Sequence, residues 1–435
     1  MRTTTHRAAL SAAMVLLVAL GHLAAPPAGA DARGNAARPG EVTPSSAVAV
    51  STSGSHTCAV LADGRVKCWG HGGGGTLGLG DTEHRGDEPG EMGDALPAVD
   101  LGAGRTATSV VAGSGQTCAI LDTGQLKCWG LNFDGNLGLG DTEHRGDEPG
   151  EMGDALPTVD LGSGRTALDV AIGAWHTCAL LDNGQVKCWG SPLYGTLGLG
   201  DDETRGDEPG EMGDALPAVD LGPGRTATAI SASGRFTCAL LDDGSVKCWG
   251  ENESGQLGIG DAEHRGDQPG EMGGALPTVD LGTGRTAVAV EAGDFHACAI
   301  LDDGTVKCWG QNDYHVTLGL GWLGGGRASD AIGDQPGEMG DALPAVDLGP
   351  GRTVESLSAS FTTCALLDTN RVKCWGDNFY GQLGVGDDEP RGDNAAMMGA
   401  ALPAVDLGPG RTATAVTAGG TSTCARIDDG RIRCW

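Results

Sequence analysis

A unit of 60 residues recurs seven times along the chain, and each copy carries two cysteines. The second cysteines stand at positions 68, 128, 188, 248 and 308, and the last two follow after 66 and then 60 residues, at 374 and 434. Such a period is typical of solenoids and propellers, in which each unit buries its faces against its neighbours. The repeat therefore limits the fold to a small set of architectures.

Each copy contains four segments with the character of short β-strands. An alternating segment is followed by Thr-Cys-Ala-Leu-Leu, Val-Lys-Cys-Trp-Gly and, after a long loop, Pro-Ala-Val-Asp-Leu-Gly, with small variations between copies. Four-stranded antiparallel units repeated seven times pack most economically around a central axis. The sequence thus predicts an all-β, seven-bladed β-propeller over residues 46–435; an open solenoid is the alternative.

The cysteines of each copy flank a tight turn. Leu61 to Arg65 fits a three-residue hairpin loop in which Gly64 supplies the positive φ, and pairing Leu61 with Arg65 sets Cys58 opposite Cys68. That site lacks ladder hydrogen bonds, so the Cα atoms approach closely enough for a disulfide. We therefore predict one disulfide within each blade: Cys58–Cys68, Cys118–Cys128, Cys178–Cys188, Cys238–Cys248, Cys298–Cys308, Cys364–Cys374 and Cys424–Cys434.

Zinc is the competing interpretation of the cysteines. Zinc sites favour Cys-x-x-Cys or Cys/His clusters, whereas nine residues separate the two cysteines of each copy, and a neighbouring histidine is absent from four of the seven copies. We accordingly expect no metal site and no cofactor.

Residues 1–30 have the features of a secretory signal peptide. Arg2 and Arg7 precede an apolar run, no acid is present, and the segment ends in Ala28-Gly29-Ala30. No later stretch is long and apolar enough for a membrane helix. We expect cleavage after Ala30 and a secreted, periplasmic or cell-surface protein, whose oxidising surroundings suit the disulfides.

Residues 31–45 form a linker that bears on how the last blade is completed. The chain stops at Trp435, before the seventh copy has its fourth strand, while Pro39-Gly-Glu-Val42 resembles that missing strand. One hypothesis is that this segment completes the seventh blade. The other is that the sequence is a fragment with an open edge.

The repeat resembles that of the regulator of chromosome condensation family. The resemblance rests on the segment from Cys238 to Asp261, especially Gly255-Gln256-Leu257-Gly258, and recurs in all seven copies. It implies a propeller of seven blades. The family's founding member is a nuclear exchange factor. We do not expect that activity here, because the sequence predicts a signal peptide and disulfides and has a net charge of −30. Secreted members, including an inhibitor of β-lactamases, imply protein binding instead.

The copies differ mainly in two connections, one before the first cysteine and one after Trp-Gly. Strand alternation places both connections on one face of the disc. Aromatic residues gather there and are typical anchors of protein interfaces, although capping of the blades would also explain them. The candidate contacts are Trp322, in an extended loop of the fifth copy, and Trp175, Phe236, Phe295, Tyr314, Tyr194, Phe133, Phe379 and Tyr380.

Other motifs have plainer explanations. The tripeptide Arg85-Gly86-Asp87 occurs in five copies. It could bind an integrin, but a loop inherited from one ancestral repeat is the simpler explanation. The nearby acids, Asp81 and Glu91 among them, could bind calcium, but their spacing matches no calcium loop, and a solvated acidic loop with Arg85 paired to an acid is the preferred interpretation.

No pattern of catalytic residues stands out, because no nucleophile elbow, metalloprotease motif or phosphate loop occurs. The acidic balance also disfavours nucleic acid. The sequence therefore predicts a secreted, non-catalytic and monomeric scaffold that binds a protein, or a glycan, on its aromatic face. A structural component of the cell envelope or matrix and a carbohydrate-binding propeller are the alternatives.

Overall fold

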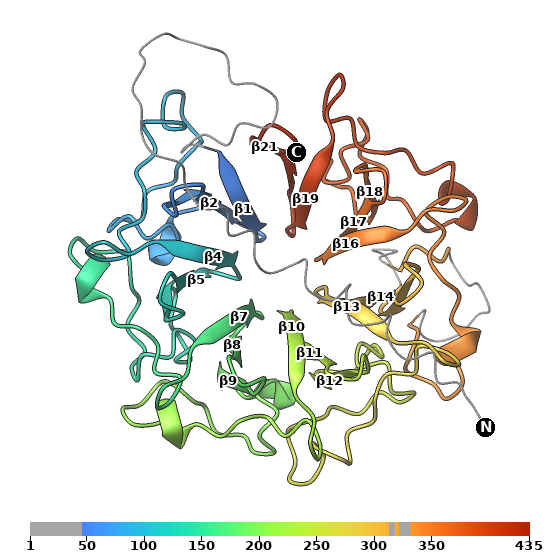
Figure 1. Ribbon diagram of the computed structural model, residues 1–435, viewed down its shortest axis with the longest axis horizontal. Helices are drawn as coiled ribbons and strands as arrows, with labels where there is room; N and C mark the ends of the chain where they lie inside the picture. Colours follow the sequence, from blue (N-terminus) through green and yellow to red (C-terminus); the bar gives the residue numbers. More distant parts are fainter. Residues whose placement is uncertain (1–45, 313–317, 322–330) are drawn as a thin grey trace, which may run out of the picture. The chain divides into compact units, whose positions relative to one another are not determined.

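The computed structural model describes residues 46–312, 318–321 and 331–435, and these residues form seven antiparallel sheets of three strands each. The sheets follow one another around a common centre, and the first strand of each lies nearest to it (Figure 1). In the described ranges no α-helix occurs, only short 3-10 turns. The predicted all-β class and the seven units are therefore confirmed.

The strands of the first four sheets have the following bounds: β1 Ala47–Thr52, β2 His56–Leu61, β3 Val66–Gly70; β4 Ala107–Ala112, β5 Gln116–Leu121, β6 Leu126–Gly130; β7 Ala167–Ile172, β8 His176–Leu181, β9 Val186–Gly190; β10 Ala227–Ser233, β11 Phe236–Leu241, β12 Val246–Gly250. Those of the last three are β13 Ala287–Ala292, β14 His296–Leu301, β15 Val306–Gly310; β16 Val354–Ala359, β17 Thr362–Leu367, β18 Val372–Gly376; β19 Ala413–Ala418, β20 Thr423–Ile427, β21 Ile432–Cys434. The 3-10 turns are η1 Gly73–Gly75, η2 Gly153–Ala155, η3 Leu193–Gly195, η4 Gly213–Ala215, η5 Gly340–Ala342 and η6 Ala395–Met397.

The hairpin register and the disulfides are as predicted. The Leu61 amide donates to the Arg65 carbonyl, Gly64 has a φ of 79°, and Cys58 pairs with Cys68 across β2 and β3. The Cα atoms of this pair are 4.1 Å apart, the close spacing of a pair without ladder hydrogen bonds. All seven disulfides form in this way, and in the sixth copy Asn370 provides the positive φ.

Each sheet has three strands, not the predicted four. The segment expected to form the fourth strand, Pro97 to Gly102 in the first copy, runs beside β3 but makes a single backbone hydrogen bond to it, from the Val99 amide to the Val66 carbonyl. Pro97 has no amide hydrogen to donate, and one bond does not make a ladder. The side chains of Val99 and Leu101 are nevertheless buried, so the segment covers the core without extending the sheet.

The hydrophobic core lies between neighbouring sheets. Cys58, Val60 and Leu77 of the first copy pack in one cluster with Leu121 and Trp129 of the second. The Trp129 indole is fully buried, and its Nε1 donates to the Thr76 carbonyl of the preceding copy. Tryptophans 189, 249, 309 and 435 make the same bond to the preceding copy. The repeated tryptophan therefore joins one copy to the next.

The first and seventh sheets are also in contact. The Ala47 amide donates to the Gly430 carbonyl at 2.9 Å, and the Thr52 amide donates to Thr417 Oγ1 at 3.2 Å. These bonds join β1 to the last repeat. The predicted signal peptide 1–30, the linker 31–45 and the closing segment 39–42 lie outside the described residues.

Seven disulfides indicate an oxidising environment, since cytosolic thiols are kept reduced. Across the described ranges, no helix has the length and hydrophobicity needed to cross a membrane.

Candidate functional site

The two variable connections of each copy lie side by side. In the third copy the Ser191 amide, which follows β9, donates to the carbonyl of Trp175, which precedes β8, at 2.9 Å. The same bond recurs in the first, second, fourth, fifth and sixth copies. We call the surface formed by these connections the variable face; its parts are 53–55, 113–115, 173–175, 234–235, 293–295, 360–361 and 419–422 before the second strands, and 71–76, 131–136, 191–196, 251–256, 311–312 and 377–382 after the third strands.

Five of the predicted contact residues are exposed on the variable face. Their exposed fractions are 52% for Trp175, 62% for Phe133, 38% for Phe295, 70% for Phe379 and 73% for Tyr380. Aromatic side chains this exposed keep their apolar area available to a partner. Leu193, which the sequence analysis did not select, adds 56% exposure beside Tyr194.

Phe236 is not part of this surface, which corrects the prediction. Its side chain is fully buried, because Phe236 is the first residue of β11 and not a member of the connection before it. The equivalent residues His56, His176 and His296 are buried as well. The aromatic ring at this position thus serves packing between sheets. Trp322 and Tyr314 lie outside the described residues.

Tyr194 is half-buried and contacts two residues of the fourth copy. The guanidinium of Arg235 lies 5.2 Å from the centre of its ring, and the His264 ring meets it edge-on at 4.9 Å. Tyr194 also has a φ of 64°. Most residues at the equivalent position of the other copies are polar or glycine. A left-handed conformation costs a non-glycine residue about 1 kcal/mol or more. The variable face therefore holds one aromatic ring in a defined but unfavourable backbone geometry.

The buried histidines connect successive sheets. His56 Nε2 lies 2.7 Å from Thr117 Oγ1, and His176 and His296 meet Thr237 and Thr363 at 2.8 Å. Burial lowers the pKa of His176 from its ordinary 6.5 to about 4. These rings are neutral at pH 7, and their role is structural.

The acidic loops are tied by internal bonds. Arg85 pairs with Asp81 at 2.7 Å, as predicted, and the Glu91 carboxylate accepts from the amides of Gly86 and Glu88. The arginine of this Arg-Gly-Asp tripeptide is therefore already paired. Among the described residues, no group of three or more His, Cys, Asp or Glu side chains is placed to hold a metal ion.

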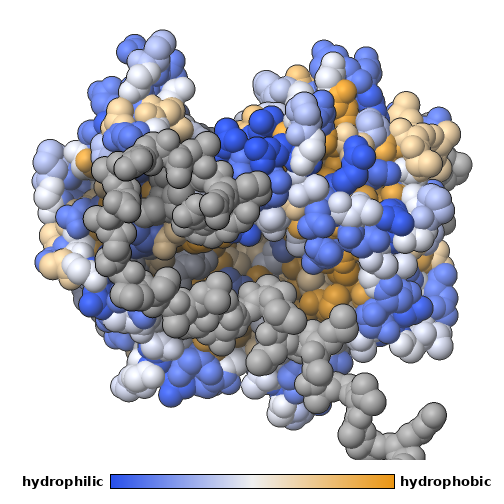
Figure 2. Space-filling view, turned by 45° about the horizontal axis from the view of Figure 1, so that its top comes forward, coloured by the Kyte–Doolittle hydropathy of each residue, from blue (hydrophilic) through white to orange (hydrophobic). Residues whose placement is uncertain are grey.

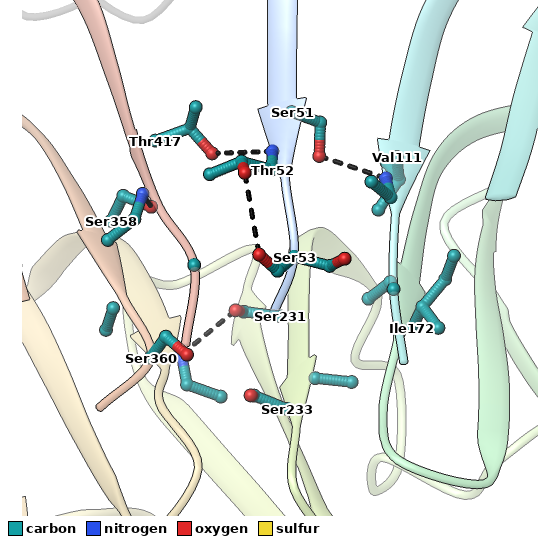
Figure 3. A pocket seen from close by; sticks show the side chains of 18 of the residues that line it. Ser51, Thr52, Ser53, Val111, Ile172, Ser231, Ser233, Ser358, Ser360 and Thr417 are labelled. Atoms are coloured by element: carbon teal, nitrogen blue, oxygen red, sulfur yellow. Dashed lines mark hydrogen bonds between the residues drawn. The ribbon is translucent and has the colours of Figure 1, made fainter. Parts of the chain in front are cut away.

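A polar cavity of about 380 Å³ lies where the first strands of the seven sheets meet. Figure 3 shows hydroxyl side chains from several of these strands around one space, among them Ser51, Ser231 and Thr417. The cavity extends to the variable face, because residues of the connections, such as Ser114 and Phe361, also line it.

Two of the carboxylates that line the same cavity come from first strands, Asp169 on β7 and Glu291 on β13. Burial raises the pKa of Asp169 to about 6. Burial, together with the charge of Asp169, raises the pKa of Glu291 to about 8, while Ser231 Oγ donates to its carboxylate at 3.3 Å. The sequence analysis missed both residues. Comparing the first strands position by position would have found them, because the other copies have Ala, Ser, Val or Thr there.

The outer surface is largely hydrophilic. On the side shown in Figure 2, blue residues make up most of the described surface, and orange residues appear in smaller areas between them. This distribution fits a chain with 58 acidic and 28 basic residues.

The sequence matches known families over nearly all of the repeats. Residues 97–435 match the RCC1-like domain, and residues 47–75 match the regulator of chromosome condensation (RCC1) repeat. The human E3 ubiquitin-protein ligase HERC2 is 32% identical over 61% of this chain, which spans only 5% of that protein. The ultraviolet-B receptor UVR8 of Arabidopsis thaliana is 27% identical over 79% of the chain and 68% of its own length.

Solved structures show the same fold. Human WBSCR16 superposes with a TM-score of 0.63 at 18% identity, over 86% of this chain and 85% of that one. Prp20p of Saccharomyces cerevisiae superposes with a TM-score of 0.62 at 16% identity, over 86% and 81%. Similarity at this level concerns the arrangement of the sheets and leaves the site to be argued from its own residues.

Proposed function

The chain belongs to the RCC1-like repeat family, and from this premise we propose that it is a secreted, non-catalytic scaffold that binds a partner protein on the variable face. The observation that carries the proposal is the exposure of Phe133, Trp175, Phe379 and Tyr380 on that one face. Aromatic anchors surrounded by polar residues are the usual centre of a protein interface.

The relatives support binding over catalysis. Yeast RCC1 (Prp20) has been solved bound to Kap60, and UVR8 is named a receptor. HERC2 is a ligase, but this chain corresponds to 5% of it, so its activity does not transfer. Guanine-nucleotide exchange is not part of the proposal, because residues 1–30 resemble a signal peptide and the disulfides suit an oxidising compartment. A monomer is proposed as the binding form.

Site-specific photo-crosslinking tests the proposal. A photo-reactive amino acid is placed at position 379 on the variable face, and in a second protein at position 168. Leu168 is a matched control, because it is 62% exposed but lies at the start of β7, at the end of that strand away from Trp175. Irradiation in the extracellular fraction of the source organism should yield a discrete protein adduct from position 379 alone. Equal adducts from both positions, or none from 379, would contradict the proposal.

A further inference from the structure

The central cavity carries an asymmetry that the repeat does not predict. Seven first strands face it, and most contribute small or hydroxyl side chains. Asp169 and Glu291 depart from this pattern, and the fourth sheet lies between them in chain order and contributes Ser231. Carboxylates line the cavity from only two of the seven first strands, so they make an otherwise repetitive cavity asymmetric.

The described lining of the cavity is acidic. It contains three carboxylates, those of Asp169, Glu291 and Asp294, and no Lys, Arg or His. Asp294 accepts a hydrogen bond from Ser360 Oγ at 2.7 Å, and Asp169 accepts one from the Val170 amide at 2.9 Å. Hydrogen bonds of this kind offset only part of the cost of burying a carboxylate, and a cation would offset more of it.

The geometry favours an organic cation over a metal ion. Calcium requires six to eight oxygens at about 2.3–2.6 Å, and no group of three or more ligand-type side chains converges in the described ranges. The cavity is also much larger than a single ion: about 380 Å³ lies within the range of small-molecule sites. Hydroxyls of Ser51, Ser231 and Thr417 around it could accept or donate hydrogen bonds to the rest of such a ligand.

We propose that the central cavity binds a small aliphatic amine, whose ammonium groups pair with the carboxylates of Asp169 and Glu291. This site is independent of protein binding on the variable face. In the empty cavity a proton keeps Glu291 neutral near pH 7, since its pKa is raised to about 8. The arriving ammonium displaces that proton to solvent, so binding strengthens as the pH rises.

Few titratable groups lie around Glu291, so the pH dependence of amine binding can be assigned to the carboxyl groups of the cavity. Asp169 and Asp294 are the other titratable groups in the described lining, while β10, β11 and β16 contribute none to it. His296 on the adjacent strand β14 stays neutral, because burial lowers its pKa to about 3. Protons that the protein releases on binding above pH 5 therefore come from the carboxyl groups.

Isothermal titration with spermidine tests the proposal. The titration uses the full chain at pH 8.5 in 0.3 M NaCl, which screens attraction to the acidic outer surface. One saturable site per chain is expected. D169N/E291Q should weaken binding at least tenfold, and lowering the pH to 5 should do the same to the wild type. Absence of a saturable site, or equal affinity in D169N/E291Q, would overturn the proposal.

Two controls separate the site from general attraction. Glu355→Gln removes one charge from β16, another first strand, where the side chain is exposed to solvent. It should leave spermidine affinity unchanged, and a loss equal to that of D169N/E291Q would overturn the proposal. Calcium binding that requires Asp169 and Glu291 would overturn the choice of an amine. Because D169N/E291Q replaces two half-buried carboxyl groups by neutral amides, it should fold with a melting temperature at least equal to the wild type; the single variant E291Q serves if it does not.

Discussion

The backbone amide of Thr52 donates to the hydroxyl oxygen of Thr417 at 3.2 Å, although 365 residues separate them. The same bond joins neighbouring sheets elsewhere: Ser51 Oγ accepts from the Ala112 amide, and Ser358 Oγ accepts from the Ala418 amide. The first and seventh sheets therefore meet through the contact that links successive repeats.

Removing this contact should cost as much as removing its counterpart between the sixth and seventh sheets. Thr417→Val and Ser358→Ala each leave a backbone amide without its acceptor, and we expect each to lower the free energy of unfolding by about 1–2 kcal/mol. Guanidinium unfolding of both variants measures the effect. A negligible cost for Thr417→Val beside a clear cost for Ser358→Ala would mean that the first and seventh sheets do not meet in solution.

His176 should make the fold sensitive to acid. Its pKa is about 4 in the folded protein and 6.5 when unfolded, so between these values the unfolded chain binds more protons. The stability that neutral His176 gives the folded protein is fully present above pH 6.5. It is lost as the pH falls toward 4, where the free energy of unfolding is lower by on the order of 3 kcal/mol. Unfolding of the wild type and of His176→Gln between pH 7 and 4 measures it.

Gln is the informative replacement for His176 because the second copy already has a glutamine, Gln116, at the equivalent position. Gln116 Nε2 donates to Thr177 Oγ1 at 2.7 Å, in the place of the histidine contact. His176→Gln should therefore match the wild type at pH 7 and lose less stability at pH 4.5. An identical pH profile for the two proteins would show that His176 is not the titrating group.

At one boundary between copies, Phe236 and Ala297 take the places of the histidine and the threonine that meet at other boundaries. At three boundaries a buried histidine meets a threonine of the next copy, but after Phe236 the corresponding residue is Ala297, and both belong to one core cluster. Phe236→His alone should destabilise by about 2 kcal/mol or more, since a buried imidazole would lack its partner. Adding Ala297→Thr should recover about 1 kcal/mol of this in a double-mutant cycle. Strictly additive effects would contradict the pairing.

Each disulfide should contribute independently. Replacing Cys238 and Cys248 together by Ala opens a loop of about ten residues and should cost about 2–3 kcal/mol on a chain-entropy basis. Thermal unfolding measures the cost, and the equivalent replacement of Cys118 and Cys128 is the control. No loss in either variant would show that the bridges do not constrain the unfolded chain.

The sequence was most informative where local geometry decides the structure. The turn at Gly64 sets the pairing of Cys58 with Cys68, so the disulfides could be predicted from one hairpin and extended to all seven copies. The fourth strand could not be predicted as reliably. An alternating segment such as Pro97 to Gly102 has strand character, but whether it makes a ladder depends on how the long loop before it approaches β3.

In the candidate site, too, strand order could be used for prediction, whereas the burial of single side chains could not. Strand order indicated that the two variable connections meet, and the Ser191 to Trp175 bond bears this out. Burial of individual rings was not predictable from their variability: Phe236 varies between copies because it faces a different partner, not because it is exposed. Asp169 and Glu291 were not predicted, because neither is aromatic and both belong to first strands and not to the two variable connections; both line the central cavity.

The binding account is tested most directly by the affinity of the partner captured at position 379. Its dissociation constant is measured for the wild type, for F133S/F379S/Y380S and for L168S/V288S, which replaces exposed apolar side chains at the starts of β7 and β13. The account predicts at least a tenfold loss for the first variant, about 1.4 kcal/mol or more, and no change for the second. Unchanged affinity for F133S/F379S/Y380S, or an equal loss for both variants, would contradict it.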